Sequence, residues 1–203
     1  DLESKIEMLV QETPTPQARS TCERNYIWIL LNQVRSNNHS PALAADPQTQ
    51  ELIDKICRQL EDYGFCNKVF NQNLKTPSTN IEGLTQIALE RTTENVTSVL
   101  AYAQSLLNDA ATPEVKDILT ECVKDYRTIT NAFTLAFKAF GERNFKEMLV
   151  QESPAPKALG LCEGNISFEP GPPVNPFFEL IEKNRQLRIL IAMSLVSGHI
   201  LST

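Results

Sequence analysis

The chain has little glycine, no excess of basic residues and no long apolar run. Seven glycines in 203 residues are few for an all-β protein, whose tight turns depend on glycine. No stretch approaches the roughly 18 consecutive apolar residues of a membrane-spanning helix, and the best one, 189–196, is short. A formal net charge of −6 is the opposite of the basic charge that nucleic-acid binding requires. We therefore expect no β-fold, no membrane span and no nucleic-acid partner.

The motifs of common catalytic sites are also missing. There is no Gly-x-Ser-x-Gly turn, no glycine-rich phosphate loop and no His-Glu-x-x-His metal motif. The two histidines, His39 and His199, fall in a predicted loop and a last helical turn, which suits surface positions. If four of the five cysteines form disulfides, Cys22 remains without an identifiable base to activate it. The sequence thus predicts a protein that is not an enzyme and has no metal or cofactor.

Apolar residues recur at intervals of three and four through most of the chain after residue 79, which is the spacing of amphipathic helices. The predicted helices cover 80–108, 113–140, 144–162 and 177–201. Pro154 and Pro156 interrupt the third, because proline lacks an amide hydrogen and clashes with the preceding turn. Short connections favour antiparallel neighbours, so the pattern predicts an all-α, up-and-down four-helix bundle.

Two shorter helices, 48–60 and 65–71, precede the bundle and form a predicted N-terminal hairpin broken at Tyr63-Gly64. Cys57 and Cys66 flank this break. On one continuous helix they would lie on opposite sides and about 13 Å apart along the axis, whereas a disulfide needs Cα atoms within roughly 7 Å. A bond between them requires the chain to turn back, and we expect Gly64 to supply the turn. The alternative is two separate buried thiols.

Cys122 lies on the core side of the second long helix, and Cys162 ends the next helical stretch. A bond between them would join two bundle helices and close a loop of about 40 residues, which stabilises a fold by about 3–4 kcal/mol in the chain-entropy model. Four cysteines permit three connectivities, and the sequence alone does not choose among them. Helical geometry favours Cys57 with Cys66 and Cys122 with Cys162.

The beginning of the chain partly repeats a later segment. Residues 7–18 and 147–158 are identical at nine of twelve positions, at an offset of 140 residues. A match of this length at a fixed offset indicates an internal repeat. The sequence therefore predicts that residues 1–45 are a partial copy, consisting of the third and last helices, of the domain that occupies residues 46–203.

Cys22 is the counterpart of Cys162 at the same offset, but the helix that would hold its partner is missing from the partial copy. Cys22 could stay unpaired, compete for Cys122 or form an intermolecular bond. Residues 1–36 could dock on a neighbouring chain, which would give a homo-oligomer, or pack against the bundle of their own chain. The sequence favours neither arrangement.

Three sequons for N-linked glycosylation bear on the compartment. They begin at Asn38, Asn95 and Asn165, and each alone is weak evidence because the pattern is short. Together with the cysteine spacing they favour the secretory pathway, where disulfides persist. We therefore expect a secreted, extracellular protein with these three candidate glycosylation sites.

The order of cysteines and helices in residues 48–203 forms a characteristic pattern. A helical hairpin carries Cys57 and Cys66, a long helix follows, Cys122 is followed by Tyr126, and Cys162 is followed by a proline-rich loop and a last helix. This pattern resembles the plant invertase/pectin methylesterase inhibitor family. The loop, 168–176, is similar to the connection found in the pectin methylesterase branch of that family.

The resemblance implies a four-helix bundle with an N-terminal hairpin and the bonds Cys57–Cys66 and Cys122–Cys162. It also implies an inhibitor that caps the active-site cleft of a cell-wall enzyme in the apoplast, with pectin methylesterase favoured over invertase as the partner. The acidic net charge suits a basic pectin methylesterase. From their helix positions, we expect Arg127, Thr130 and Phe145 to contact the target.

Two features depart from the family pattern. Invertase-directed members often carry Pro-Lys-Phe just before the third bundle helix, where this chain has Arg143-Asn144-Phe145. The third helix itself is broken by Ser153-Pro154-Ala155-Pro156, and it lies where such inhibitors meet their enzymes. Two alternatives therefore stand beside inhibition: a non-inhibitory structural or assembly protein, and a binder of a small ligand in the bundle core.

Overall fold

The computed structural model describes residues 44–167 and 177–203, which belong to the second of the two units into which the chain divides, Ala42–Thr203. The helices are α3 (Pro47–Cys57), α4 (Tyr63–Asn73), α5 (Ile81–Asp109), α6 (Pro113–Gly141), α7 (Phe145–Glu152), α8 (Ala155–Ser167) and α9 (Phe178–Ser202). Every regular element in these two described ranges is a helix, so the all-α prediction is confirmed. Residues 1–43, with Cys22 and Asn38, and residues 168–176 lie outside the described residues.

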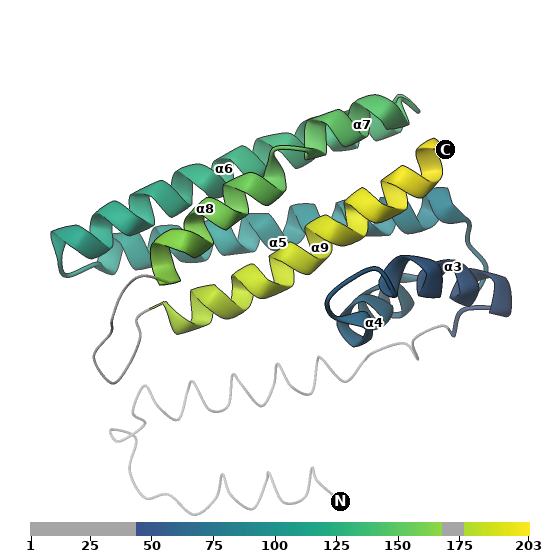
Figure 1. Cartoon of the computed structure of the whole chain (residues 1–203), viewed down its shortest axis with the longest axis horizontal. Coiled ribbons are helices and arrows are strands. Elements are labelled where there is room, and N and C mark those ends of the chain that lie inside the picture. The colour runs from purple at the N-terminus through teal and green to yellow at the C-terminus, as the bar shows by residue number, and fades with distance from the viewer. Residues whose placement is uncertain (1–43, 168–176) are drawn as a thin grey trace, which may run out of the picture. The chain divides into compact units, whose positions relative to one another are not determined.

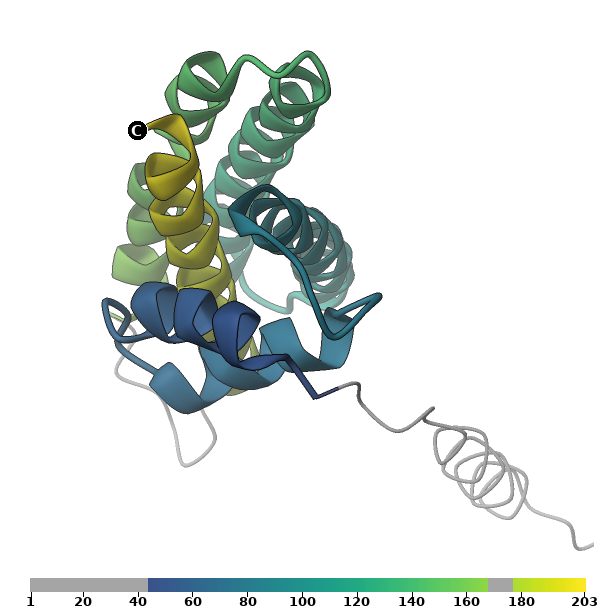
Figure 2. The same cartoon turned by 90° about the vertical axis from the view of Figure 1, so that its right-hand side faces the viewer.

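Four rods form the bundle in up-and-down order: α5, α6, the consecutive pair α7 and α8, and α9 (Figure 1). Helix α5 packs against both α6 and α9, while α6 packs against α7 and α8. The hairpin of α3 and α4 packs on α5 and α9 near one end of the bundle (Figure 2). This is the predicted four-helix bundle with a short N-terminal hairpin.

Side-chain caps explain where the helices start. The Asn80 side chain accepts a hydrogen bond of 2.9 Å from the Gly83 amide at the start of α5. The Thr112 hydroxyl accepts one of 3.4 Å from Val115 at the start of α6, where Pro113 takes the first helical position. Such caps satisfy amides that have no partner within the helix, and they agree with the helix starts predicted from the sequence.

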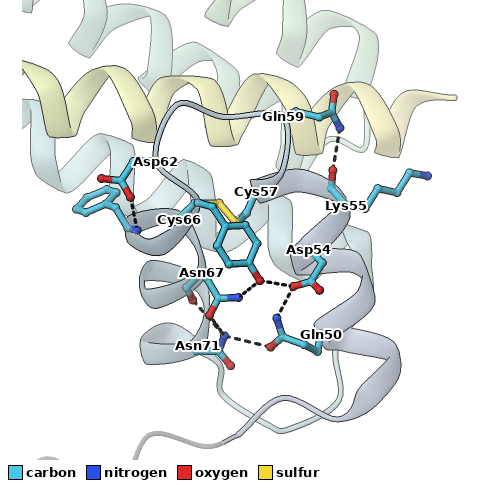
Figure 3. The surroundings of a disulfide bond; sticks show 11 residues. Gln50, Asp54, Lys55, Cys57, Gln59, Asp62, Cys66, Asn67 and Asn71 are labelled. Carbon is cyan, nitrogen blue, oxygen red and sulfur yellow. Dashed lines mark hydrogen bonds between the residues drawn. A yellow bond between two sulfur atoms is a disulfide. The ribbon is translucent and has the colours of Figure 1, made fainter.

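The hairpin turns earlier than predicted. Helix α3 ends at Cys57 and α4 begins at Tyr63, because the Asp62 carboxylate accepts a 2.8 Å hydrogen bond from the Phe65 amide and caps α4 (Figure 3). The reversal therefore occupies residues 58–62. Gly64 lies in the first turn of α4 and does not have a positive φ, so the prediction that it supplies the turn is wrong.

The reversal brings the two halves of the hairpin into covalent and polar contact. Cys57 and Cys66 are bonded, with their Cα atoms 5.5 Å apart. Beside the disulfide, the Tyr63 hydroxyl donates to Asp54 at 2.8 Å, and the Asn71 amide donates to Gln50 at 3.4 Å (Figure 3). Both hydrogen bonds join α3 to α4, so the disulfide and the polar contacts hold the same two helices.

The third rod is two helices, as the prolines predicted. Helix α7 ends at Glu152 and α8 begins at Ala155. Pro156 lies in the first turn of α8, where its missing amide hydrogen removes no hydrogen bond. Ser153 closes the end of α7, since its amide donates to the Val150 carbonyl. The break is therefore compatible with well-formed helices on both sides.

Two clusters of buried side chains make the core. The larger lies within the bundle and includes Tyr126, Phe133, Leu187 and Ile191. The smaller lies under the hairpin and includes Ile53, Phe70, Ile189 and Met193. Helix α9 contributes to both clusters, which explains why it is apolar on more than one face.

Candidate target-binding surface

Helix α6 carries two of the three predicted contact residues. Arg127 is exposed, and within the part of the chain that the structure describes it has no ion pair or hydrogen bond from its side chain. Thr130 is half-buried, and its hydroxyl donates to the Tyr126 carbonyl at 2.8 Å. A partner could pair with the Arg127 guanidinium without breaking an existing contact, whereas the Thr130 hydroxyl is already engaged.

The third predicted residue, Phe145, lies at the corner between α6 and α7. Its ring centroid is 5.9 Å from that of Phe140, and the guanidinium carbon of Arg143 lies 5.7 Å from the Phe145 centroid. Arg143 also donates two hydrogen bonds, of 2.9 and 3.1 Å, to the carboxylate of Glu82 on α5. The corner is thereby tied to the first rod, and the Phe145 ring has a defined position.

The chain reaches Phe145 through an unusual backbone conformation. Gly141 is the last residue of α6, but the residue with a left-handed backbone is Arg143, with a φ of 56°. This conformation lets the amides of Arg143 and Asn144 donate to the last carbonyls of α6 at 2.9 Å each. Non-glycine residues adopt it at a cost of roughly 1–2 kcal/mol, which here places the Arg143 side chain between Glu82 and Phe145.

The structure does not bring the three predicted residues into one small patch. Arg127 precedes Phe140 by thirteen residues on α6, which is about 20 Å along the helix axis. A protein–protein interface of ordinary size covers about 800 Å² on each partner, a patch roughly 30 Å across. Arg127 and Phe145 could therefore contact the same partner, but only from opposite parts of an interface of that size.

Exposed apolar side chains mark the same helices, and the sequence analysis missed them. Six large hydrophobic residues are exposed in the described residues. Four of them lie on α6, α7 and α8: Leu135, Phe137, Val150 and Leu161. We call these four the α6–α8 surface. Val150 and Leu161 are 60% and 53% exposed, and large apolar side chains left in water mark protein-binding surfaces where several of them lie together.

The comparisons with known proteins agree with the fold. Residues 51–169 match the model of the family described as plant invertase/pectin methylesterase inhibitor, and this match covers more than half of the chain. The chain belongs to the plant invertase/pectin methylesterase inhibitor family. Proteins of this family are inhibitors and not enzymes, which agrees with the prediction from the missing catalytic motifs.

Individual relatives of this inhibitor-family chain are distant. It is 28% identical over 81 residues to the cell wall / vacuolar inhibitor of fructosidase 1 of Arabidopsis thaliana, a match that spans 40% of this chain and only 38% of that protein. A mutant form of a pectin methylesterase inhibitor from Arabidopsis superposes with a TM-score of 0.64 at 19% identity, covering 73% of this chain and 95% of the other. A second pectin methylesterase inhibitor structure from Arabidopsis thaliana gives 0.56 at 20% identity, with 74% and 96% covered. At these identities the solved structures show the shared fold alone.

A disulfide fixes the two helices that carry most of the α6–α8 surface. Cys122 of α6 and Cys162 of α8 are bonded, with their Cα atoms 4.7 Å apart. The Tyr126 hydroxyl lies 3.1 Å from the Cys162 sulfur, and burial raises the pKa of this tyrosine well above its ordinary range. The hydroxyl therefore stays protonated and polar inside an apolar core, so it needs a hydrogen-bond acceptor.

One carboxyl group is buried at the break of the third rod. Glu152, the last residue of α7, is fully buried, and one of its oxygens accepts a 2.9 Å hydrogen bond from the Ser194 hydroxyl of α9. Its other oxygen has no partner in the described residues. Desolvation raises the pKa of Glu152 from its ordinary 4.5 to about 7. Sequence periodicity could not reveal this group, because glutamate is read as a surface residue.

The remaining predicted sites are the sequons, of which Asn38 lies outside the described residues. Asn95 is half-buried on α5, and Asn165 is exposed in the last turn of α8. No cluster of three or more His, Cys, Asp or Glu side chains in residues 44–167 and 177–203 could hold a metal ion. Among the same residues, no helix is long and apolar enough to cross a membrane.

Proposed function

We propose that the chain is a proteinaceous inhibitor that caps the active-site cleft of a plant cell-wall enzyme, pectin methylesterase in preference to invertase. The observation that carries this proposal is the α6–α8 surface, where four large apolar side chains are exposed on helices held by a disulfide. Family membership supports an inhibitory role. Rigid elements suit such a role, because a surface that is ordered before binding loses little entropy when it binds.

The preference for pectin methylesterase rests on the corner between α6 and α7. Arg143-Asn144-Phe145 retains only the phenylalanine of the tripeptide that invertase-directed members often carry. Asn144 stands at the position of the tripeptide's lysine and carries no charge, while the neighbouring Arg143 pairs with Glu82 and contacts the Phe145 ring. The net charge of −6 favours a basic enzyme as partner.

An extracellular location, in the apoplast, follows from the same proposal. Two disulfides, Cys57–Cys66 and Cys122–Cys162, join the described helices, and disulfides persist in oxidising compartments. The name of the Arabidopsis relative places that protein in the cell wall or vacuole. A cell-wall enzyme would be within reach of an inhibitor secreted there.

Titration of both enzymes with the purified full chain tests the proposal. We expect stoichiometric loss of pectin methylesterase activity at mildly acidic pH and weaker inhibition of invertase. Leu161→Glu should weaken the inhibition at least tenfold, because it places a charge within the apolar contact. Phe178→Glu is the matched control, since Phe178 is 68% exposed on α9 and lies outside the α6–α8 surface. The proposal would be overturned if neither enzyme is inhibited at micromolar concentrations of the chain.

A structural or assembly role is a second candidate, because the third rod is broken between Glu152 and Ala155. In that role residues 1–36 of the partial copy, with Cys22, would join one chain to another. Native mass spectrometry under non-reducing conditions separates the two candidates: disulfide-linked oligomers that inhibit neither enzyme support assembly, and an inhibitory monomer contradicts it.

A small ligand bound between α8 and α9 has less support. The groove between α8 and α9, bordered by Leu159, Ile191 and Leu195, holds about 140 Å³. Ligand pockets usually hold about 300–1,000 Å³. Without room for a ligand of ordinary size, this groove does not favour a carrier function.

A further inference from the structure

A groove lies where the hairpin meets the bundle, on the side of the molecule formed by α4, α5 and α9. It holds about 300 Å³, at the lower end of the range for ligand sites. Phe65 and Val69 of α4 and Leu190 of α9 provide apolar lining, and α5 contributes Arg91, Glu94 and Asn95. The groove thus combines an apolar wall with a polar wall.

Two buried polar atoms on the polar wall have no hydrogen-bond partner in the described residues: Nε of Arg91 and Oδ1 of Asn95. The two residues are four apart on α5, so they lie on the same side of the helix. The terminal guanidinium nitrogen of Arg91 pairs with Glu94, which leaves Nε as a separate, unused donor. A buried polar atom without a partner costs about 1–3 kcal/mol, and native proteins seldom leave two together.

Asn95 is also the acceptor residue of a sequon. Its side chain has no hydrogen bond within the described residues, and its amide nitrogen, unlike Oδ1, is not among the buried atoms without a partner. Val96 is buried, so it cannot turn outward, while Thr97 is exposed, with its hydroxyl donating to the Thr93 carbonyl at 2.8 Å. Asn165, by contrast, is fully on the surface in the last turn of α8.

We propose that Asn95 carries an N-linked glycan whose first N-acetylglucosamine lies in this groove. A sugar of this kind has C–H faces that pack on Phe65 and Val69, together with hydroxyl and acetamide groups that can accept from a guanidinium and donate to an amide oxygen. Arg91 Nε and Asn95 Oδ1 are shielded from solvent in the unmodified chain, so they would gain these partners once their side chains turn toward the groove. The proposal uses the extracellular location of the proposed function but not the inhibitory activity.

The attachment is ordinary glycosyl transfer from a lipid-linked oligosaccharyl diphosphate to the chain before it folds. A bond forms between Asn95 Nδ2 and the anomeric carbon, the anomeric carbon–oxygen bond to the diphosphate breaks, and the Nδ2 proton is taken up by the released diphosphate. No oxidant or reductant is needed. The folded groove only receives the sugar.

Glycopeptide mapping of the full chain, secreted from insect cells, tests the attachment, and thermal unfolding tests the packing. We expect Asn95 to be occupied in most molecules. We also expect the midpoint of unfolding to be retained when an endoglycosidase trims the glycan to its first sugar. Thr97→Ala, which removes the sequon but keeps Asn95, should lower the midpoint by about 3–6 °C, the shift expected for one or two lost hydrogen bonds. Thr97→Ser, which keeps the sequon, should not lower it.

Two further comparisons isolate the groove. In a Phe65→Ala background, removal of the sequon should lower the midpoint by less than half as much as in the original chain. Asn165→Gln should leave the midpoint within about 1 °C, the size expected for a surface substitution. An unoccupied Asn95 in the secreted protein overturns the proposal, and so does an occupied Asn95 whose trimmed form unfolds at the same midpoint as the Thr97→Ala variant.

The source of the sugar is tested with unglycosylated protein produced in bacteria. NMR titration with N-acetylglucosamine should give no saturable shifts of the α4 and α5 amides at millimolar concentration. Saturable binding there, with Asn95 unmodified in the secreted protein, would identify a site for soluble saccharides and overturn the assignment to an attached glycan. Enzyme inhibition is measured separately, so failure of either proposal is recognised independently.

Discussion

The hydroxyl of Tyr126 donates a 2.6 Å hydrogen bond to the side-chain oxygen of Asn184 and joins α6 to α9 in the centre of the bundle. Tyr126 is fully buried and Asn184 is 1% exposed. The Asn184 amide also lies 3.8 Å from the Cys162 sulfur, so the pair is adjacent to the disulfide. Since these polar groups satisfy each other, they favour one register of α9 against α6 over the neighbouring ones.

Removing the Tyr126 hydroxyl should destabilise the fold measurably. Tyr126→Phe leaves the Asn184 oxygen buried without a donor, so we expect the free energy of unfolding to fall by about 1–3 kcal/mol. Urea unfolding followed by circular dichroism measures it. Tyr102→Phe is the control, because the Tyr102 hydroxyl donates to Glu179 at 3.0 Å in an exposed position. This substitution should lower the free energy of unfolding by less than about 1 kcal/mol. Equal effects of the two substitutions would contradict the role given to Asn184.

The two disulfides should differ in their contribution. Replacing Cys122 and Cys162 together by alanine opens a loop with a sequence separation of 40, for which the chain-entropy model gives about 3–4 kcal/mol. The same change at Cys57 and Cys66, separated by 9, should lower the free energy of unfolding by about 2–3 kcal/mol. Urea midpoints of the two variants provide the comparison. A larger loss from the hairpin pair would show that residual structure or packing, and not loop closure, decides the difference.

Glu152 should make the fold less stable as the pH rises through the weakly acidic range. Its carboxyl ionises at about 4.5 in the unfolded chain and at about 7 in the fold, so between these values the folded state holds a proton that the unfolded state has lost. Its contribution to the free energy of unfolding therefore falls between pH 4.5 and pH 7, by about 3 kcal/mol in all. Glu152→Gln keeps an acceptor for Ser194 and should flatten this decline, whereas Glu147→Gln, an exposed change on the same helix, should not.

At lower pH the stability of the fold rises with pH, opposite to the effect of Glu152, because of the helix caps. A hydrogen bond from the Thr49 amide lowers the pKa of Asp46, and one from the Phe65 amide lowers that of Asp62. These groups stabilise the fold above their ordinary range, and that contribution is lost as the pH falls below about 4. Unfolding followed from pH 3 to pH 8 should therefore show greatest stability near pH 4.5, and a maximum at neutral pH would contradict the raised pKa of Glu152.

The left-handed backbone of Arg143 gives a test with paired variants. Arg143→Ala and Arg143→Gly both remove the ion pair with Glu82 and the contact with Phe145. Only alanine keeps a side chain in the left-handed conformation, so the glycine variant should be more stable than the alanine variant by about 1 kcal/mol. Chemical unfolding measures the difference. An alanine variant as stable as the glycine variant would mean that the corner relaxes when the arginine is lost.

Arg127 should affect binding and not stability. Because its side chain has no partner in the described residues, Arg127→Ala should change the free energy of unfolding by no more than about 0.5 kcal/mol. If it contacts the target enzyme, inhibition should weaken about tenfold or more. Lys68→Ala, an exposed change on α4, is the control and should leave inhibition intact. Unchanged inhibition by the Arg127 variant would remove this residue from the contact surface.

The sequence predicted α5 and α6 because each carries an apolar stripe and an explicit cap, Asn80 for α5 and Thr112 for α6. It also favoured the two cysteine pairs that the structure contains, since helix geometry leaves few ways to bring them within bonding distance. The hairpin turn was predicted two to three residues too late, because the Asp62 cap started a helix where glycine and tyrosine suggested a break. These features depend on local interactions that can be read from a short stretch of chain.

Features that depend on tertiary contacts could not be predicted in the same way. Glu152 is buried because α9 approaches α7 closely there: an added Cβ at Gly198 would lie 2.5 Å from the Met148 methyl group. The exposure of Val150 and Leu161 depends on the orientations of α7 and α8, the two helices of the third rod. The left-handed Arg143 is stabilised by Glu82, which is 61 residues away in the chain. No local pattern contains these partners.

The bond between Cys122 and Cys162 closes a covalent ring that runs through the last two thirds of α6, all of α7 and the first half of α8. The exposed residues Ser153 and Pro154 lie inside this ring. A protease that cut one peptide bond there would leave a single molecule, whose two fragments separate only after reduction. Both sides of the cut would stay attached to the bundle. A molecule cleaved between α7 and α8 would therefore still carry Val150 and Leu161 together.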